Sequence, residues 1–231
     1  GVTMADPVKM LTSHEAAYLA GLSERDMHRA IDEKLVPEDL VRVGKGRRAF
    51  TPAVSVLMAY YMDHRDRLTA SERRRVIEST AHRVHAEFLD ENASMHLSVS
   101  FLVGSSAVEP GDDLKIVTPY IERVRDRLDR LVKARNLVHS TPEVLSGTPV
   151  IRGTRVPVHS VAGTYAEEGI AGALDAYPAL DRDTVELAKL YADTHPRRGR
   201  PTTRAVPEGA TVVSIRRRKR GEARAGVAAR S

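Results

Sequence analysis

Apolar residues recur at helical spacing along the first part of the chain, and turn residues divide this pattern into short helices. Thr12 and Glu15 have the spacing of a capping box, which begins a helix. Gly21 can adopt the left-handed backbone that ends this helix, and Ser23 begins another shortly afterwards. The second helix is predicted to bury the stripe Met27, Ala30 and Ile31. This order of elements is typical of a helix-turn-helix.

A β-hairpin is predicted for residues 41–50, VRVGKGRRAF, because two short β-prone runs flank a Gly-Lys-Gly turn. Thr51 and Pro52 then open a further helix, since Pro is favoured at the first helical position. We therefore expect residues 1–65 to form a winged helix-turn-helix.

Residues 66–135 are expected to form a connecting segment. A helix over about 69–90 carries a narrow apolar seam, which either packs on its own domain or forms a dimer contact; its members are Ile77, Ala81, Val84 and Phe88. Residues 97–103, LSVSFLV, predict a strand, and Thr118-Pro119 predicts the start of another helix.

The stretch SGTPVIRGTRVPVHS, residues 146–160, breaks the helical pattern with two glycines and two prolines. It contains no lysine and neither of the common nucleotide-loop patterns, so it is interpreted as an extended lead-in. Arg152 and Arg155 are expected to hold a helix C-terminus or a carboxylate. Three short helical segments follow at about 158–167, 170–177 and 182–194, which gives a module over residues 136–196.

The composition favours a mainly α protein built from small modules, since aromatic residues make up 4% of the chain and Trp is absent. Without Cys, the chain has no disulfide, thiolate ligand or cysteine nucleophile. The sequence contains no apolar run of the roughly 18 residues that cross a membrane. We expect a cytoplasmic protein with no membrane contact.

The net charge of +5 is distributed unevenly. Residues 200–231 hold nine Lys or Arg against two Glu, so they carry +7 and the preceding residues carry −2. We interpret residues 197–231 as a flexible basic tail that binds an acidic partner.

The winged helix-turn-helix offers a candidate DNA surface. The candidates are Ser23, Arg25, His28 and Arg29 on the second helix, and Arg42, Lys45, Arg47 and Arg48 on the hairpin. Residues 1–65 hold nine basic and nine acidic residues, so a scaffold for dimerisation or partner binding is the alternative.

Residues with catalytic or metal-binding chemistry are not grouped along the sequence. His82 and His85 lie on one helical face without an evident third ligand, so a solvated face is favoured over a metal site. The sequence shows no combination of nucleophile, base and oxyanion site. We expect a protein that is not an enzyme and needs no cofactor.

Residues 141–192 resemble a small three-helix family first described without a function. The resemblance is carried by a Tyr-Pro-x-Leu joint at Tyr177, by the ending Ala188 to Ala192, and by the signature residues Gly147, Pro149, Ile151, Gly153, Thr154, Arg155, Pro157 and Val158. Members are generally regarded as antitoxins whose partners are PIN-domain, Mg²⁺-dependent ribonucleases.

The N-terminal stretch HEAAYLAGLSERDMHRAIDEKLVP, with the basic hairpin after it, resembles the winged helix-turn-helix of MerR-like regulators. Together the two resemblances imply a VapB-type antitoxin.

The tail contains one β-prone island directly before a basic run. Val212, Val213 and Ile215 can add to the edge of a partner's sheet, which would bring Arg216, Arg217 and Arg218 to the carboxylates that hold Mg²⁺ in the toxin. Nucleic-acid contact and simple solvation are the alternatives.

The sequence thus predicts an antitoxin that inhibits a ribonuclease and, as a homodimer on operator DNA, represses its own operon. The alternative is a stand-alone winged-helix transcription regulator whose tail contacts DNA.

Overall fold

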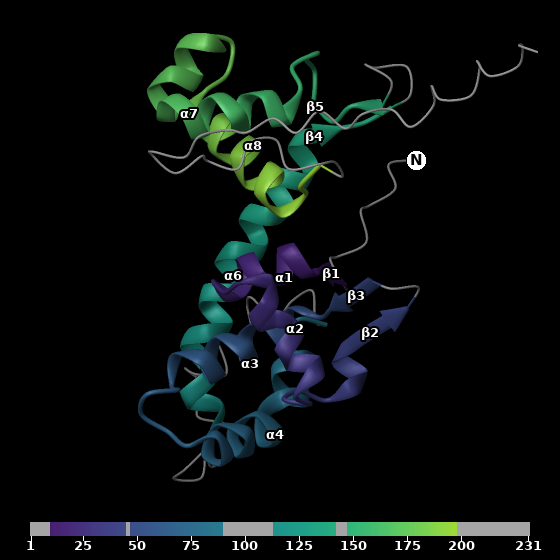
Figure 1. The fold of residues 1–231 in the computed structure, drawn as a ribbon, viewed down its shortest axis with the longest axis vertical. Coiled ribbons are helices and arrows are strands. Elements are labelled where there is room, and N and C mark those ends of the chain that lie inside the picture. Colours follow the sequence, from purple (N-terminus) through teal and green to yellow (C-terminus); the bar gives the residue numbers. More distant parts are fainter. Residues whose placement is uncertain (1–9, 45–46, 90–112, 142–146, 198–231) are drawn as a thin grey trace, which may run out of the picture. The chain divides into compact units, whose positions relative to one another are not determined.

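The computed structural model describes residues 10–44, 47–89, 113–141 and 147–197. These residues are mainly helical, with a few short strands (Figure 1), which confirms the predicted fold class. The strand expected at 97–103 and the tail from residue 198 lie outside the described residues.

The first two helices are α1, Ser13–Ala20, and α2, Glu24–Asp32. Both begin with a capping box, in which the side chains of Thr12 and Ser23 accept backbone N–H groups of the first turn. Gly21 ends α1 at φ +70°, in the left-handed region that suits glycine, and its N–H donates to Ala17 and Tyr18 carbonyls. The predicted helix, turn and helix are confirmed.

A small antiparallel sheet packs with these helices. It consists of β1, Leu11–Thr12, β2, Val41–Gly44, and β3, Arg47–Phe50, with β3 in the middle. A short 3₁₀ helix, η1, Glu38–Leu40, leads into β2. Leu11 and Val41 both pair with Phe50, which is fully buried. The predicted hairpin is confirmed.

One hydrophobic core runs across the boundary expected at residue 65. The helix α3, Pro52–Asp63, lies at its centre and is buried on nearly every side, and α4, Ala70–Ala86, and α6, Asp113–Leu137, pack around it. The seam residues Ile77, Ala81 and Val84 are fully buried in this core. The seam of α4 therefore packs within its own chain and is not free for a dimer contact.

The start predicted for the following helix at Thr118-Pro119 is wrong, because α6 begins at Asp113 and contains Pro119. Val117, two residues before this proline, is fully buried in the core, and Thr118, directly before it, donates its hydroxyl to the Leu114 carbonyl at 2.9 Å. Packing of the apolar stripe of α6 against the core thus keeps the helix continuous through Pro119, although proline disfavours the interior of a helix.

The C-terminal module begins with β4, Val138–His139, which pairs with β5, Val150–Ile151. Two helices follow, α7, Val158–Ala176, and α8, Arg182–Thr194. Gly169 has a non-helical backbone inside α7, at φ +74° and ψ −171°, and divides it into two segments. The three predicted helical segments are confirmed, and they enclose a second core around Val158, Val161 and Val185.

The described residues form one compact unit that ends at Arg197. No helix within these residues is both long enough and apolar enough to cross a membrane.

Candidate nucleic-acid interface

Ser23 is the N-cap residue of α2, and Arg25 lies in the first turn of this helix. The Ser23 hydroxyl is committed to the helix cap, since it donates to Asp26 at 2.6 Å and accepts the Asp26 N–H at 3.2 Å. Arg25 is exposed, and its side chain has no hydrogen bond or ion pair among the described residues. Of these two candidates, Arg25 has the freer side chain.

The next two candidates on α2 are held by neighbouring side chains. The His28 Nε2 atom lies 3.0 Å from the Ser13 hydroxyl of α1. Arg29 donates its Nε–H to Glu33 at 2.9 Å, and this hydrogen bond and the charge of Glu33 raise the Arg29 pKa above its usual value.

Arg48 of β3 bridges the hairpin to α2. Its guanidinium donates to the Asp32 carboxylate at 2.8 Å and to the His28 carbonyl at 3.4 Å. Arg48 pairs in register with Val43, and paired residues of antiparallel strands share a face of the sheet. Val43 and Arg48 therefore lie on the face of the hairpin that turns toward α2.

The other basic residues of the hairpin lie on its opposite face. The register pairs Arg42 with Ala49 and Arg47 with Gly44, one position out of step with Arg48, and side chains alternate along a strand. The side chains of both arginines are exposed and have no hydrogen bond or ion pair among the described residues. Lys45 lies outside the described residues. The structure thus gathers five of the candidates around α2 and separates Arg42 and Arg47 from them.

The signature stretch forms a turn that attaches the C-terminal module to α6. Gly147 and Gly153 have positive φ, at 81° and 77°, which glycine tolerates best. The Thr154 hydroxyl donates to the Ile151 carbonyl and accepts the Val156 N–H, which closes the turn. Pro157 is the N-cap residue of α7.

Arg152 donates its Nε–H to the Asn136 carbonyl at 2.9 Å, at the C-terminus of α6. This confirms the role predicted for Arg152. Arg155 is exposed and makes no such contact among the described residues.

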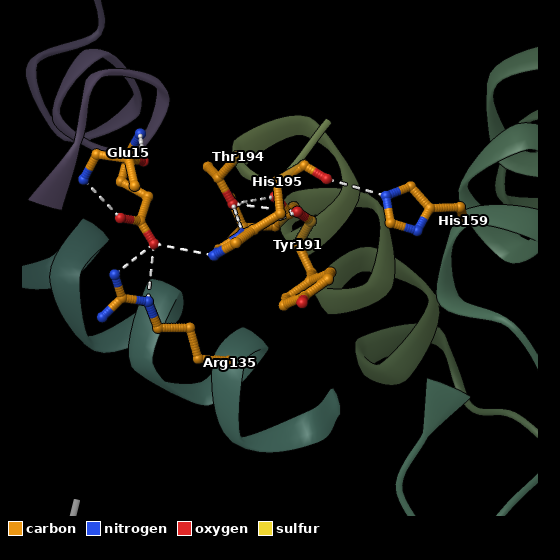
Figure 2. Close-up of polar contacts among 8 residues, drawn as sticks. Glu15, Arg135, His159, Tyr191, Thr194 and His195 are labelled. Carbon is orange, nitrogen blue, oxygen red and sulfur yellow. Dashed lines mark hydrogen bonds and ion pairs between the residues drawn. The ribbon is translucent and has the colours of Figure 1, made fainter. Parts of the chain in front are cut away.

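Glu15, which the sequence predicts only as part of a helix cap, is a buried carboxylate that joins several elements (Figure 2). Glu15 is fully buried and accepts the Thr12 backbone N–H at 2.8 Å. It also accepts both the Nε–H of Arg135 from α6, at 2.8 Å, and an Nη2–H of the same residue. The His195 Nε2 atom lies 3.1 Å from the Glu15 Oε1 atom. We call Glu15, Arg135 and His195 the Glu15 junction.

The junction sets the protonation state of Glu15. Burial by itself raises the pKa of this carboxyl, but the hydrogen bonds from His195, Thr12 and Arg135 outweigh burial and lower the pKa to about 2. Glu15 is therefore a carboxylate at any pH near neutrality.

His195 is in turn held by the C-terminal module. Its ring stacks on Tyr191, with centroids 4.3 Å apart, and its carbonyl lies 2.9 Å from the Nε2 atom of His159 in α7 (Figure 2). Arg135 and His195 are 120 and 180 residues away from Glu15, and no local pattern links them. The only signal in the sequence was an acidic residue on an otherwise apolar helix face.

A second arginine of α6 contacts the other end of α1. Arg127 donates to the carbonyls of Tyr18 and Leu19 at 3.3 and 3.0 Å. These are among the last carbonyls of α1, which have no partner inside the helix. The two ends of α1 are thus held by two arginines of a single helix.

Within the described ranges, no three His, Asp or Glu side chains are placed to hold a metal ion. His82 of α4 instead lies 3.7 Å from Asp39. Asp181 accepts the Thr184 N–H at 2.8 Å and caps α8.

The chain is similar to one protein family over its C-terminal module and to a relative over most of its length. Residues 138–192 match a family described as "Protein of unknown function (DUF433)", which covers β4, β5, α7 and most of α8. A relative from Sinorhizobium fredii, "Uncharacterized protein y4eO", is 37% identical over 212 residues, which cover 90% of this chain and 92% of the relative. No solved structure matches. The chain therefore belongs to the family of the Sinorhizobium fredii protein y4eO.

Proposed function

We propose that this chain is a DNA-binding antitoxin, which represses its own operon and inhibits a PIN-domain, Mg²⁺-dependent ribonuclease through its C-terminal region. The observation that carries the proposal is the combination of two units in one chain. Two capped helices with a glycine turn and a basic hairpin precede a module that matches a family of unknown function, and the resemblance of its signature to antitoxins is what supports the proposed activity.

The N-terminal unit supports DNA binding. In helix-turn-helix proteins the second helix enters the major groove, and side chains from its N-terminal half contact base edges. Arg25 occupies this position on α2, and Arg42 and Arg47 add exposed charge on the hairpin.

Inhibition of the partner is assigned to the tail, which lies outside the described residues. The charge of +7 on its residues 200–231 suits a partner whose Mg²⁺ site is a cluster of carboxylates, since guanidinium groups bind carboxylates in a bidentate geometry. Val212, Val213 and Ile215 are proposed to dock on the toxin, and Arg216, Arg217 and Arg218 to occupy its metal site.

A homodimer is proposed because helix-turn-helix proteins commonly read two half-sites. The dimer contact must use a surface other than the apolar seam of α4, which is buried in the core.

The test is co-expression of this chain with each adjacent reading frame, followed by capture of the chain and washing at high salt. A stoichiometric partner whose Mg²⁺-dependent ribonuclease activity emerges only when this chain is removed supports the antitoxin. Absence of any partner, together with a shift of the chain's own promoter DNA, supports the stand-alone regulator instead.

A further inference from the structure

The candidate DNA surface contains basic residues in two electrostatic states. Arg29 and Arg48 each have a carboxylate of their own chain within 2.9 Å, Glu33 for the first and Asp32 for the second. Arg25, Arg42 and Arg47 have no such partner among the described residues. The five arginines should therefore differ in how strongly they attract a polyanion such as DNA.

The two paired arginines, Arg29 and Arg48, should attract a phosphate only weakly. A phosphate that approaches Arg29 or Arg48 also meets Glu33 or Asp32, so attraction to the guanidinium is offset by repulsion from the carboxylate. Arg48 is further tied to the His28 carbonyl. Its contacts hold β3 against α2, which is a positioning role.

Arg25 differs because the acidic residues on either side of it are engaged elsewhere. The Glu24 carboxylate lies 2.5 Å from the His14 Nδ1 atom, and the Asp26 carboxylate accepts from Ser23 in the capping box. The guanidinium of Arg25 thus keeps its five N–H donors available on the exposed side of α2.

We propose that Arg25 is the residue with which α2 reads a guanine in the major groove, and that Arg48 positions the hairpin without contacting DNA. This inference rests on the DNA-binding part of the proposed function. A guanidinium fork matches the O6 and N7 acceptors of guanine, which is the commonest specific contact of arginine in the major groove. Arg42 and Arg47, on the outer face of the hairpin, then contact phosphates.

The test uses the full chain and a duplex selected from a random library by the unmodified chain. Binding is measured over a range of salt concentrations, and on duplexes in which each base pair is replaced in turn. We expect Arg25→Ala to reduce the preference for one G·C pair by about tenfold or more, while the dependence of log Kd on log salt stays unchanged.

The other variants separate positioning from phosphate contact. Arg42→Ala should weaken binding to all duplexes alike and lower the salt slope by about 1. Arg48→Ala should weaken binding without lowering the slope, and the exchange Asp32→Arg with Arg48→Asp should restore it. Arg155→Ala, which removes an exposed arginine of the C-terminal module whose side chain has no partner among the described residues, is the control and should leave both slope and base preference as they are.

Two results would overturn the assignment while leaving DNA binding intact. One is an Arg25→Ala chain that keeps its preference at every G·C pair, and the other is an Arg48→Ala chain whose salt slope falls by about 1. A failure of the unmodified chain to select any duplex would overturn the DNA-binding proposal itself and this inference with it. Melting temperatures of all variants show that a loss of binding is not a loss of fold.

Discussion

At the scale of single residues, Glu15 shows how one side chain can serve a local and a distant role together. Its carboxylate closes the capping box with Thr12 and also receives Arg135 and His195. A fully buried carboxylate is costly unless hydrogen bonds and an opposite charge compensate it, and here both are present.

Removal of the Glu15 charge should destabilise the folded chain far more than removal of an exposed carboxylate. We expect Glu15→Gln to lower the free energy of unfolding by about 3 kcal/mol, because Arg135 loses its partner in a partly buried site. Urea denaturation measures the loss. Glu33→Gln, which breaks the exposed pair with Arg29, is the control and should cost about 0.5 kcal/mol or less. Equal losses in the two variants would contradict a special role for the Glu15 junction.

Glu15 should also make stability depend on acid pH. Its pKa in the folded chain is about 2, below the ordinary value of 4.5, so the unfolded chain binds the proton more readily. The stabilisation is complete above pH 4.5 and is lost as the pH falls through about 2. The difference in unfolding free energy between the unmodified chain and Glu15→Gln should therefore shrink steadily over this range. A difference that is independent of pH would show that Glu15 is not ionised with a depressed pKa.

At the scale of elements, α1 is short and its two ends are held from outside. Glu15 near its start and the carbonyls of Tyr18 and Leu19 near its end are bound by Arg135 and Arg127 of α6. A helix of eight residues has little stability of its own. The position of α1, and with it that of α2, therefore depends on α6.

Gly21 tests this dependence, because it lies between α1 and α2 at φ +70°. A Cβ atom there would lie 2.7 Å from the Arg127 Nη1 atom. We expect Gly21→Ala to reduce the unfolding free energy by about 1–3 kcal/mol, from backbone strain and from displacement of Arg127. Gly163→Ala in α7, where a Cβ would meet nothing within 4 Å, should change it little or raise it by up to about 1 kcal/mol. A neutral Gly21→Ala would mean that the Arg127 contact adds nothing to stability.

At the scale of the whole molecule, one core joins the N-terminal helices to α4 and α6, and the Glu15 junction ties them to the C-terminal module. The positive charge, by contrast, is concentrated beyond residue 199. If the tail serves the toxin and α2 serves the operator, the two activities are separable along the chain.

Truncation after Arg200 separates them. The shortened chain should lose ribonuclease inhibition by at least tenfold, because the proposed docking residues and Arg216–Arg218 are removed. Its binding to a specific DNA duplex should keep its base preference, with a modest loss of affinity from the missing charge. Inhibition and DNA affinity are measured on the same preparation. Undiminished ribonuclease inhibition by the shortened chain would refute the role of the tail. A large fall in the dependence of log Kd for DNA on log salt would favour the stand-alone regulator.

The sequence by itself determined the features that depend on neighbouring residues. Capping boxes, the Gly21 turn, the hairpin over 41–50 and the break at Gly169 follow from backbone preferences and short-range hydrogen bonds, which operate within a few residues. The general role of Arg152, to hold a helix C-terminus, could also be predicted, but its partner Asn136 lies 16 residues away and was identified only by the fold.

Arg29 and Glu33 pair at the i,i+4 spacing of one helix, but tertiary structure alone decided which charged groups pair over longer separations. Glu15 meets Arg135 and His195 across 120 and 180 residues, and Arg48 meets Asp32 across 16, and no periodicity records such distances. Packing likewise carried α6 through Pro119 and buried the seam of α4. The candidate DNA residues could be named as a set from the sequence. The division into free and neutralised arginines required the fold, because a charge is neutralised by whatever lies beside it in space.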